Sequence, residues 1–255
     1  MSKVITVTNQ KGGVGKTTTA INVAFYLAKS GHKTLLIDFD PQGNSSSGLG
    51  LPKESLNATM SEVLLGQVAL ANIIVKTEVK NLLVAPSTPK LADVEVKISE
   101  VDHRFTLLKQ AISTVAKDYE YIVIDSPPSL SLLTVNGMIA ADYLLLPVQT
   151  EFYALEGVAQ LLETMKLIRK ASNPSLRILG VVATMYDKRT SLSGQVLDEI
   201  KKYFKDLVFE TTIPRNIRLA EAPSHGVPIG QYDKFSKGAK AYKKLTEEIL
   251  ERING

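Results

Sequence analysis

The sequence predicts an α/β fold in which a single doubly wound, mainly parallel sheet carries helices on both faces. First, short apolar runs of strand length recur along the 255 residues. Second, stretches with the spacing of amphipathic helices separate these runs, which is the order of βαβ units. Third, the runs are continuously apolar and do not alternate with polar residues. We therefore expect their strands to be buried on both faces, as in a parallel sheet.

The expected strands are apolar and rich in β-branched residues. They cover residues 3–9, 34–37, 82–84, 121–124, 143–146, 178–183 and 207–212. The first helix is expected over residues 16–30, because apolar residues recur there at helical spacing, and it should end at Gly31. The segment 44–50 is rich in Ser and Gly, so we expect a mobile loop. No linker is long enough to divide the chain, so residues 1–255 are expected to form a single domain.

The composition permits this fold and excludes several classes of function. Hydrophobic residues make up 44% of the chain and charged residues 22%, which is enough apolar surface for a packed core. The absence of Cys excludes disulfide scaffolds, thiolate zinc sites, iron–sulfur clusters and cysteine nucleophiles. The net charge of +4 is mildly basic, so binding to a polyanion would need a local concentration of charge.

The sequence shows neither an export signal nor a membrane span. Residues 1–7 lack the charged and apolar regions of a signal peptide. No stretch approaches the ~18 uninterrupted apolar residues that a membrane span needs. We therefore expect a cytoplasmic protein. His32, His103 and His225 lack the spacing of metal ligands and are expected to be ordinary surface or packing residues.

A glycine-rich segment, the phosphate loop (residues 10–18, QKGGVGKTT), lies between the first expected strand and the first expected helix. A loop in this place directs backbone N–H groups and the positive end of the helix dipole at one point. Glycines let the backbone approach an anion closely. Lys16 adds a full positive charge, and the Thr17 hydroxyl is placed to reach Mg²⁺. The loop therefore predicts a phosphate-binding site.

Two common glycine motifs do not fit the phosphate loop. The pattern G-x-x-x-x-G-K-[ST] needs a glycine where the chain has Gln10, and G-x-G-x-x-G fails because Thr18 takes its last position. The second failure disfavours NAD or FAD as the ligand. From spacing alone, Lys11 is either a solvated loop lysine or a second positive charge for the phosphates.

Carboxylates follow two of the expected strands. Asp38 and Asp40 come after the second strand in the segment DFDPQGN, and Asp125 follows the apolar run 121–124. The carboxyl ends of parallel strands form the ligand edge of such a sheet, so these groups should lie near the phosphate loop. Asp125 has Walker B form, in which a carboxylate holds Mg²⁺ directly or through water. The alternative is that these are ordinary turn residues.

The C-terminal third carries a local excess of positive charge. Residues 234–244 contain five Lys and no acidic residue. Lys237, Lys240 and Lys244 fall on one helical face. No pattern for base recognition appears, so contacts with nucleic-acid phosphates would dominate and sequence preference would be weak. A solvated helix face is the alternative.

These motifs resemble those of the ParA/MinD family of deviant Walker A ATPases, in particular chromosome-partitioning ParA proteins of the Soj type. Every position of the family loop K-G-G-x-G-K-[ST]-[ST] is present from Lys11 to Thr18, and the blocks TMYDKRT and IPRNIRLAEAP match as well. The resemblance runs over essentially the whole chain. It implies a P-loop NTPase-like fold, ATP and Mg²⁺ as cofactors, and ATP hydrolysis at a slow basal rate.

The resemblance implies roles for individual residues. The implied nucleotide-binding residues are Lys11, Gly12, Gly13, Val14, Gly15, Lys16, Thr17, Thr18, Pro214 and Asn216, the last two in the adenine pocket. The implied catalytic residues are Lys11, which reaches the phosphates of the partner subunit, Lys16, and Asp40, which positions the attacking water. The implied metal ligands are Thr17, Asp38 and Asp125. The implied DNA-binding residues are Arg189 and Arg218, to which the lysine count adds Lys237, Lys240 and Lys244.

The resemblance also implies partners and a place in the cell. ATP would join two copies into a homodimer that binds double-stranded DNA non-specifically, which makes the protein nucleoid-associated. Hydrolysis, stimulated by a ParB-like centromere-binding protein, would release the DNA.

Two other classes of function remain open. A MinD-like membrane-surface ATPase would need a C-terminal amphipathic helix, but residues 245–255 carry three Glu and no aromatic residue. We therefore expect no stable membrane anchor. A small-molecule ligase on the same scaffold is the other class, although nothing in the sequence specifies its substrate. A reductase of the nitrogenase iron-protein kind is excluded by the absence of Cys.

Overall fold

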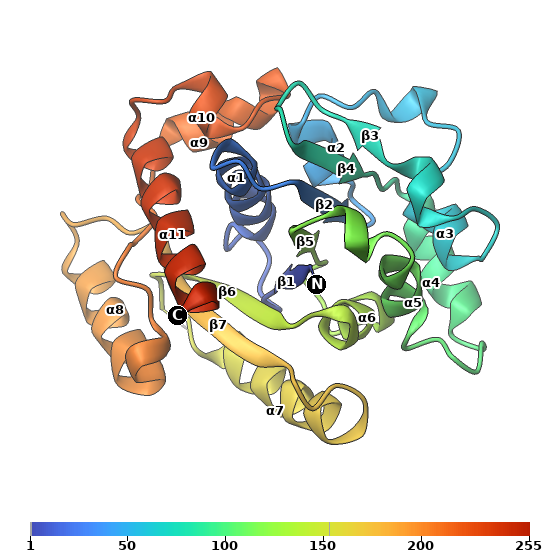
Figure 1. Ribbon diagram of the computed structural model, residues 1–255. Helices are drawn as coiled ribbons and strands as arrows, with labels where there is room; N and C mark the ends of the chain where they lie inside the picture. Colours follow the sequence, from blue (N-terminus) through green and yellow to red (C-terminus); the bar gives the residue numbers. More distant parts are fainter. Residues whose placement is uncertain (1, 153) are drawn as a thin grey trace.

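The computed structural model describes residues 2–152 and 154–255. Within these residues, seven strands form one sheet in the order β3-β4-β2-β5-β1-β6-β7 (Figure 1). Neighbouring strands are parallel, except that β3 runs antiparallel to β4. The strands are β1 (Lys3–Val7), β2 (Thr34–Asp38), β3 (Val75–Lys76), β4 (Leu82–Ala85), β5 (Tyr121–Asp125), β6 (Tyr143–Gln149) and β7 (Arg177–Thr184).

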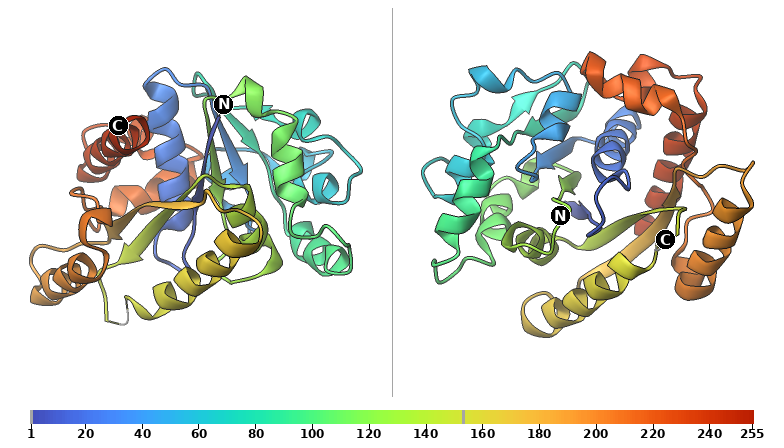
Figure 2. Two further views of the ribbon diagram at one scale, coloured as in Figure 1. Left: turned by 60° about the horizontal axis from the view of Figure 1, so that its bottom comes forward. Right: turned by 180° about the vertical axis from the view of Figure 1, so that it is seen from behind.

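Helices connect the strands and cover both faces of the sheet (Figure 2). The longer ones are α1 (Lys16–Lys29), α4 (Lys90–Ile98), α5 (Leu107–Ser113), α6 (Leu132–Ala140), α7 (Glu156–Ala171), α8 (Ser191–Phe204) and α11 (Lys237–Asn254). The shorter ones are α2 (Asn44–Gly48), α3 (Met60–Leu64), α9 (Ile217–Glu221) and α10 (Ile229–Tyr232), with the 3₁₀ helices η1 (Lys53–Ser55), η2 (Leu70–Ile73), η3 (Ala116–Asp118), η4 (Lys205–Leu207) and η5 (Ala222–His225). Helices α1 and α11 lie on one face, and α4 to α7 lie on the other.

The central strands send successive side chains into two separate cores. In β5, Ile122 and Ile124 join the core that contains α4 to α7, whereas Val123 joins the core that contains α1 and α11. All five residues of β5 are buried. This confirms the α/β doubly wound class, because only a strand covered by helices on both faces is apolar at every position.

The expected strand at residues 207–212 is wrong. These residues make only an isolated bridge, between Val208 and Val181. Side chains of α11 bind the backbone groups that a strand would have used. The Arg252 guanidinium donates to the carbonyl of Val208 (2.9 Å), and the Glu248 carboxylate accepts two backbone N–H groups of the same segment (2.9 and 3.0 Å). The N–H of Phe209 still donates to the carbonyl of Val181 in β7 (2.9 Å), so charged side chains of a distant helix interrupt the ladder after one bond.

The expectation of a loop at residues 44–50 is also wrong in part, because α2 occupies most of the segment. Ser45 and Ser46 are fully buried there. Their hydroxyls donate to carboxylates at the ends of β2 and β5. A Ser-rich composition favours a solvated loop only when the hydroxyls face water.

The sheet topology places the ends of several strands together. Strand β1 lies between β5 and β6, and the strand order reverses there, which is where ligands bind in open α/β sheets. The register pairs Asp125 with both Val7 and Asp38, so the phosphate loop and two predicted carboxylates meet at one edge. No helix among the described residues is long and apolar enough to cross a membrane.

Candidate functional site

The phosphate loop folds between β1 and α1 around two glycines with left-handed backbone. Gly13 has φ 75° and Gly15 has φ 88°, a region that costs little for glycine and more for other residues. A Cβ atom at Gly13 would meet nothing within 4 Å, so the backbone on this side is open to a ligand. The first turn of α1 follows Gly15 directly. Its free N–H groups and the helix dipole therefore favour an anion here.

Lys16 lies inside the phosphate loop. Its Nζ atom donates to the carbonyl of Lys11 (2.9 Å), and the side chain is buried. Burial lowers the pKa of Lys16, while the charges of Asp125 and Asp40 act against that change. An ammonium group with a single neutral acceptor gains from exchanging it for charged phosphate oxygens. The Lys11 backbone N–H, in turn, donates to the Asn9 side chain (3.0 Å).

Two side chains that the sequence analysis did not single out hold the loop in place. The Thr184 hydroxyl, at the end of β7, donates to the carbonyl of Val14 (2.8 Å). The Asn9 amide donates to the carbonyl of Pro147 in β6 (2.8 Å). Thr184 lies at the end of an apolar run and opens the block TMYDKRT, and these are the signals in the sequence that could have found it.

The three predicted carboxylates lie together beside Lys16. Asp38 and Asp125 are fully buried, and Asp40 is nearly so. Desolvation raises the pKa of Asp38, and it raises the pKa of Asp125 further because the charge of Asp38 adds to it. The Asp40 carboxylate accepts the backbone N–H of Gln42 (2.9 Å). The site therefore concentrates negative charge that a cation would neutralise.

The partners of Asp38 and Asp125 differ. Both Asp38 oxygens accept hydrogen bonds, from the N–H and hydroxyl of Ser46 and from the N–H of Asp40. One oxygen of Asp125, Oδ2, accepts the hydroxyl of Ser45 (2.8 Å). The nearby Thr17 hydroxyl acts to lower the pKa of this carboxyl. The other oxygen, Asp125 Oδ1, is buried and has no hydrogen-bond partner in the structure.

These oxygens fit a magnesium ion that takes most of its ligands from elsewhere. The described part of the chain contains no group of three His, Cys, Asp or Glu side chains able to hold a metal. The open Asp125 Oδ1 and a lone pair of the Thr17 hydroxyl are hard oxygen donors. Magnesium prefers such donors and completes its octahedron with water and phosphate oxygens.

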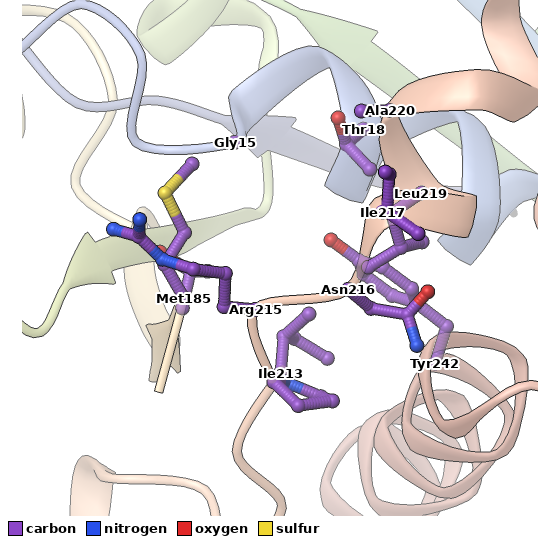
Figure 3. Close-up of a pocket in the computed structure, with 12 residues that line it drawn as sticks. Gly15, Thr18, Met185, Ile213, Arg215, Asn216, Ile217, Leu219, Ala220 and Tyr242 are labelled. Atoms are coloured by element: carbon purple, nitrogen blue, oxygen red, sulfur yellow. The ribbon is translucent and has the colours of Figure 1, made fainter. Parts of the chain in front are cut away.

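A cavity of about 460 Å³, the loop-side cavity, opens next to Gly15 and Thr18. The predicted Pro214 and Asn216 line it, and Figure 3 shows Asn216 there. The side-chain oxygen of Asn216 accepts the backbone N–H of Arg218 (2.9 Å). The side-chain amide nitrogen of Asn216 is therefore left for a ligand. The volume lies within the range of small-molecule sites.

Most of the other side chains that line the loop-side cavity are apolar. In Figure 3, Met185 lies on one side of it and Tyr242 of α11 on the other. The Tyr242 hydroxyl pairs with that of Thr19 in α1 (3.1 Å). Neither Met185 nor Tyr242 was predicted to line a cavity. Tyr242 lies within the lysine-rich residues 234–244, which were interpreted only as a region of positive charge.

A second hollow of about 840 Å³, the basic groove, shares residues 214–217 of its lining with the loop-side cavity. The predicted Arg189, Arg218 and Lys237 line it, whereas Lys240 and Lys244 are exposed on α11 outside its lining. Arg189 forms a two-pronged ion pair with Asp187 (2.7 and 2.9 Å). Arg218 pairs with Glu221 (3.0 Å). Two further cations that line the groove, Lys188 and Arg215, were not predicted.

The chain is similar to several known proteins. Residues 2–178 match the family described as AAA domain. The chain is 49% identical over 249 residues to the sporulation initiation inhibitor protein Soj of Bacillus subtilis, which covers 98% of each chain. It is 46% identical over 252 residues to the chromosome partitioning protein ParA of Myxococcus xanthus, which covers 99% of this chain and 89% of that one.

A solved structure is similar over the whole chain. It is that of cobyrinic acid a,c-diamide synthase from Mycobacterium smegmatis with bound ADP and magnesium. The TM-score is 0.88 at 34% identity, and the match covers 100% of this chain and 96% of that chain. Together with the deviant phosphate loop and the carboxylates beside it, these matches show that the chain belongs to the ParA/MinD family of ATPases and, within it, to the Soj type.

Proposed function

We propose that this ParA-type partitioning ATPase works as an ATP-controlled DNA-binding dimer. ATP joins two copies, the dimer binds double-stranded DNA without sequence preference, and hydrolysis releases it. ATP and Mg²⁺ are its cofactors. The observation that carries this proposal is the shared wall between the two hollows. Residues 214–217 line both the loop-side cavity and the basic groove, so a nucleotide in one contacts the same segment as DNA in the other.

The geometry supports specific tasks for the residues around the phosphates. Lys16 and the backbone of the phosphate loop bind the phosphate chain, while Pro214 and Asn216 line the space for the base. Thr17 and Asp125 hold Mg²⁺, which neutralises phosphate charge when bound. Asp40 orients the attacking water, and Lys11 contacts the phosphates of the partner subunit. Catalysis is then positioning and charge stabilisation, with no covalent intermediate.

The basal rate of hydrolysis is proposed to be slow. Arg215, the arginine that lines the loop-side cavity, is paired with Glu151 (3.2 Å). An arginine that neutralises the transition state speeds phosphoryl transfer by roughly 10³–10⁵. A ParB-like centromere-binding protein is therefore proposed as the partner that accelerates hydrolysis. The protein would be cytoplasmic and nucleoid-associated, with residues 1–255 acting as one domain.

Dimerisation gives DNA binding its dependence on ATP. If each subunit contacts two or three phosphates, the dimer contacts about five, and affinity falls with a slope of about −0.9 per contact. The dimer then loses roughly several hundred-fold in affinity between about 50 and 200 mM salt, and a single subunit much less. Doubling the number of phosphate contacts by dimerisation therefore determines whether the protein binds DNA.

The MinD-like alternative has less support. The apolar side of the last long helix is already used, because Tyr242, Leu245 and Ile249 are buried against the core. An amphipathic helix binds a membrane only with an apolar face that is free. A small-molecule ligase like the synthase with 34% identity also has less support, because the identity to Soj reaches 49%.

A gel-shift experiment tests the proposal. An arbitrary duplex is incubated with the protein and either ADP, ATP or a non-hydrolysable ATP analogue, at two salt concentrations. We expect retardation with ATP and the analogue, little with ADP, and a steep loss at the higher salt. Lys16→Ala, which lacks the charge that binds the phosphates, is the control and should not respond to ATP. Equal retardation with ADP and ATP would overturn the proposal.

A further inference from the structure

We propose that Ser46 is a positioning residue for ATP hydrolysis, and that Asp38 serves as its anchor and not as a metal ligand. Ser46 ties α2 to Asp38, and the chain segment closed by this contact holds Asp40 in place. The inference rests on the proposed function, because it assigns a task within the hydrolysis of ATP. It reassigns Asp38, which the family resemblance implies as a ligand of Mg²⁺.

Both oxygens of the Asp38 carboxylate already accept hydrogen bonds, and the shorter bonds converge on one of them. Its Oδ2 atom accepts the backbone N–H of Ser46 at 2.7 Å and the Ser46 hydroxyl at 2.6 Å. Its Oδ1 atom accepts the backbone N–H of Asp40 at 3.4 Å. Both Asp38 and Ser46 are completely buried. A short, charge-assisted pair of this kind is strong in a dry interior, where no water competes for the oxygen.

Asp125 shows the opposite arrangement. Its Oδ2 atom accepts the hydroxyl of Ser45, whereas its Oδ1 atom is buried without a hydrogen-bond partner. A buried acceptor without a partner costs free energy that a cation or its water would recover. Of the two carboxylates, Asp125 is therefore the one with an oxygen available to Mg²⁺.

The anchor closes a short segment of chain around Asp40. The segment leaves β2 at Asp38 and returns to it at Ser46, and Asp40 lies between them. Within it, the Gly43 N–H donates to the carbonyl of Asp40 (2.9 Å), and the carboxylate of Asp40 accepts the N–H of Gln42. Tying both ends of so short a segment leaves the Asp40 carboxylate little freedom.

The loop that follows β4 contacts this segment and restrains it further. The backbone N–H of Ser87 donates to the Ser46 hydroxyl (3.1 Å). Gly43 has φ 59°, and a Cβ atom there would lie 2.6 Å from the carbonyl oxygen of Ser87. The Ser46 hydroxyl therefore joins the ends of β2 and β4 through one oxygen atom. Removing that oxygen breaks both contacts while leaving the backbone bond to Asp38.

The first test compares two serines of α2. Ser46→Ala removes the buried hydroxyl, and Ser47→Ala, on the exposed side of the same helix, is the matched control. We expect Ser46→Ala to lower kcat by about 10- to 100-fold, the cost of a displaced catalytic group, with KM for ATP unchanged. Hydrogen exchange of residues 40–46 should accelerate in Ser46→Ala and stay as in the wild type in Ser47→Ala. A kcat equal to that of Ser47→Ala would overturn the role of Ser46.

The second test does not depend on activity and decides the role of Asp38. Binding of a fluorescent ATP analogue is measured while Mg²⁺ is titrated into the wild type, Asp38→Asn and Asp125→Asn. We expect Asp125→Asn to need at least ten times more Mg²⁺, and Asp38→Asn to need the wild-type concentration. An equal rise in both variants would make Asp38 a metal ligand and overturn the inference. If Ser46→Ala fails to fold in a melting experiment, the Asp38→Asn comparison decides alone.

The outcomes separate this inference from the proposed function. If the wild type neither binds nor hydrolyses ATP, the proposed function fails. If the wild type hydrolyses ATP and Ser46→Ala does so equally well, only the positioning role fails.

Discussion

At the scale of single residues, the two buried carboxylates Asp38 and Asp125 govern the behaviour of the site. Their charges are packed against each other at the ends of β2 and β5, away from water. Such a pair is tolerated because hydroxyl and N–H donors surround it, from Ser45, Ser46 and Thr17. The arrangement stores an electrostatic cost that a bound cation removes, which links metal binding to the stability of the fold.

This cost predicts a pH dependence of stability. Burial raises the pKa of Asp38 to about 6 and that of Asp125 to about 8. In the unfolded chain both ionise near a pKa of about 4, so between that pH and about 8 the folded state binds more protons. The free energy of unfolding therefore falls as pH rises through this window. We expect the melting temperature of the nucleotide-free protein to fall between about pH 5 and pH 8.

Asp125→Asn is the control for the pH prediction, because it removes the group with the larger shift. Its melting temperature should change less with pH than that of the wild type. The pKa of Asp187 is lowered by its hydrogen bond to Arg189, so any contribution of Asp187 is lost below the window and not within it. A melting temperature that rises between these pH values in the wild type would contradict the prediction.

At the scale of elements, the basic groove depends on segments that follow β7 and α8. Arg189 comes from the turn after β7, Arg218 from α9, and Lys237 from the first turn of α11. The two arginines are held by Asp187 and Glu221, so they would be oriented before a DNA phosphate bound in the proposed complex. These pairs are exposed and therefore weak, which lets a phosphate replace the carboxylate.

Substituting these arginines tests the groove. Arg189→Ala and Arg218→Ala should each weaken binding to every DNA sequence alike. Each should flatten the salt dependence by ~1.8 in the slope, because a dimer loses two phosphate contacts at about 0.9 each. Arg177→Ala is the matched control, since Arg177 is an exposed arginine at the opposite end of β7. The measurement is the equilibrium binding of two unrelated duplexes over a range of salt. Unchanged slopes for both variants would place the DNA surface elsewhere.

The prediction of single elements succeeded where local pattern was sufficient. The buried strands and α1 were predicted because their apolar runs and glycine stops are local signals. Residues 207–212 have the composition of a strand, yet Glu248 and Arg252 of α11 bind their backbone. The sequence of those six residues does not indicate that Glu248, nearly forty positions away, will bind their backbone.

At the scale of the whole molecule, the proposed function requires two copies to meet across the phosphate loop. Gly12 and Gly13 are exposed, and Lys11 is partly exposed. In the proposed dimer, an open loop of this kind would leave the phosphates within reach of a second subunit, and Lys11 of one copy would contact the phosphates of the other.

Variants that separate hydrolysis from dimerisation test this arrangement. Asp40→Ala should bind ATP without hydrolysing it and should sediment as a persistent dimer. The double variant Lys11→Ala/Asp40→Ala lacks the lysine charge that is proposed to contact the phosphates of the partner subunit. It should sediment as single chains with the same nucleotide. The measurement is sedimentation velocity at saturating ATP, with ADP as the control. Single chains for Asp40→Ala with ATP would contradict the dimer, and normal hydrolysis by that variant would remove Asp40 from the catalytic residues.

The sequence by itself determined the fold class, the phosphate loop and the carboxylates at the strand ends. These follow from local order, because a strand, a glycine loop and a helix in succession place their own functional groups, and parallel strands end at one edge. Only the tertiary structure decided which hydroxyl meets which carboxylate, and that residues 214–217 line both the loop-side cavity and the basic groove. One example is the hydrogen bond from Thr184 to Val14, which joins residues 170 positions apart. Hydrogen bonds between such distant residues depend on how the sheet brings the strands together. The sequence around a hydroxyl does not indicate which acceptor it will bond to.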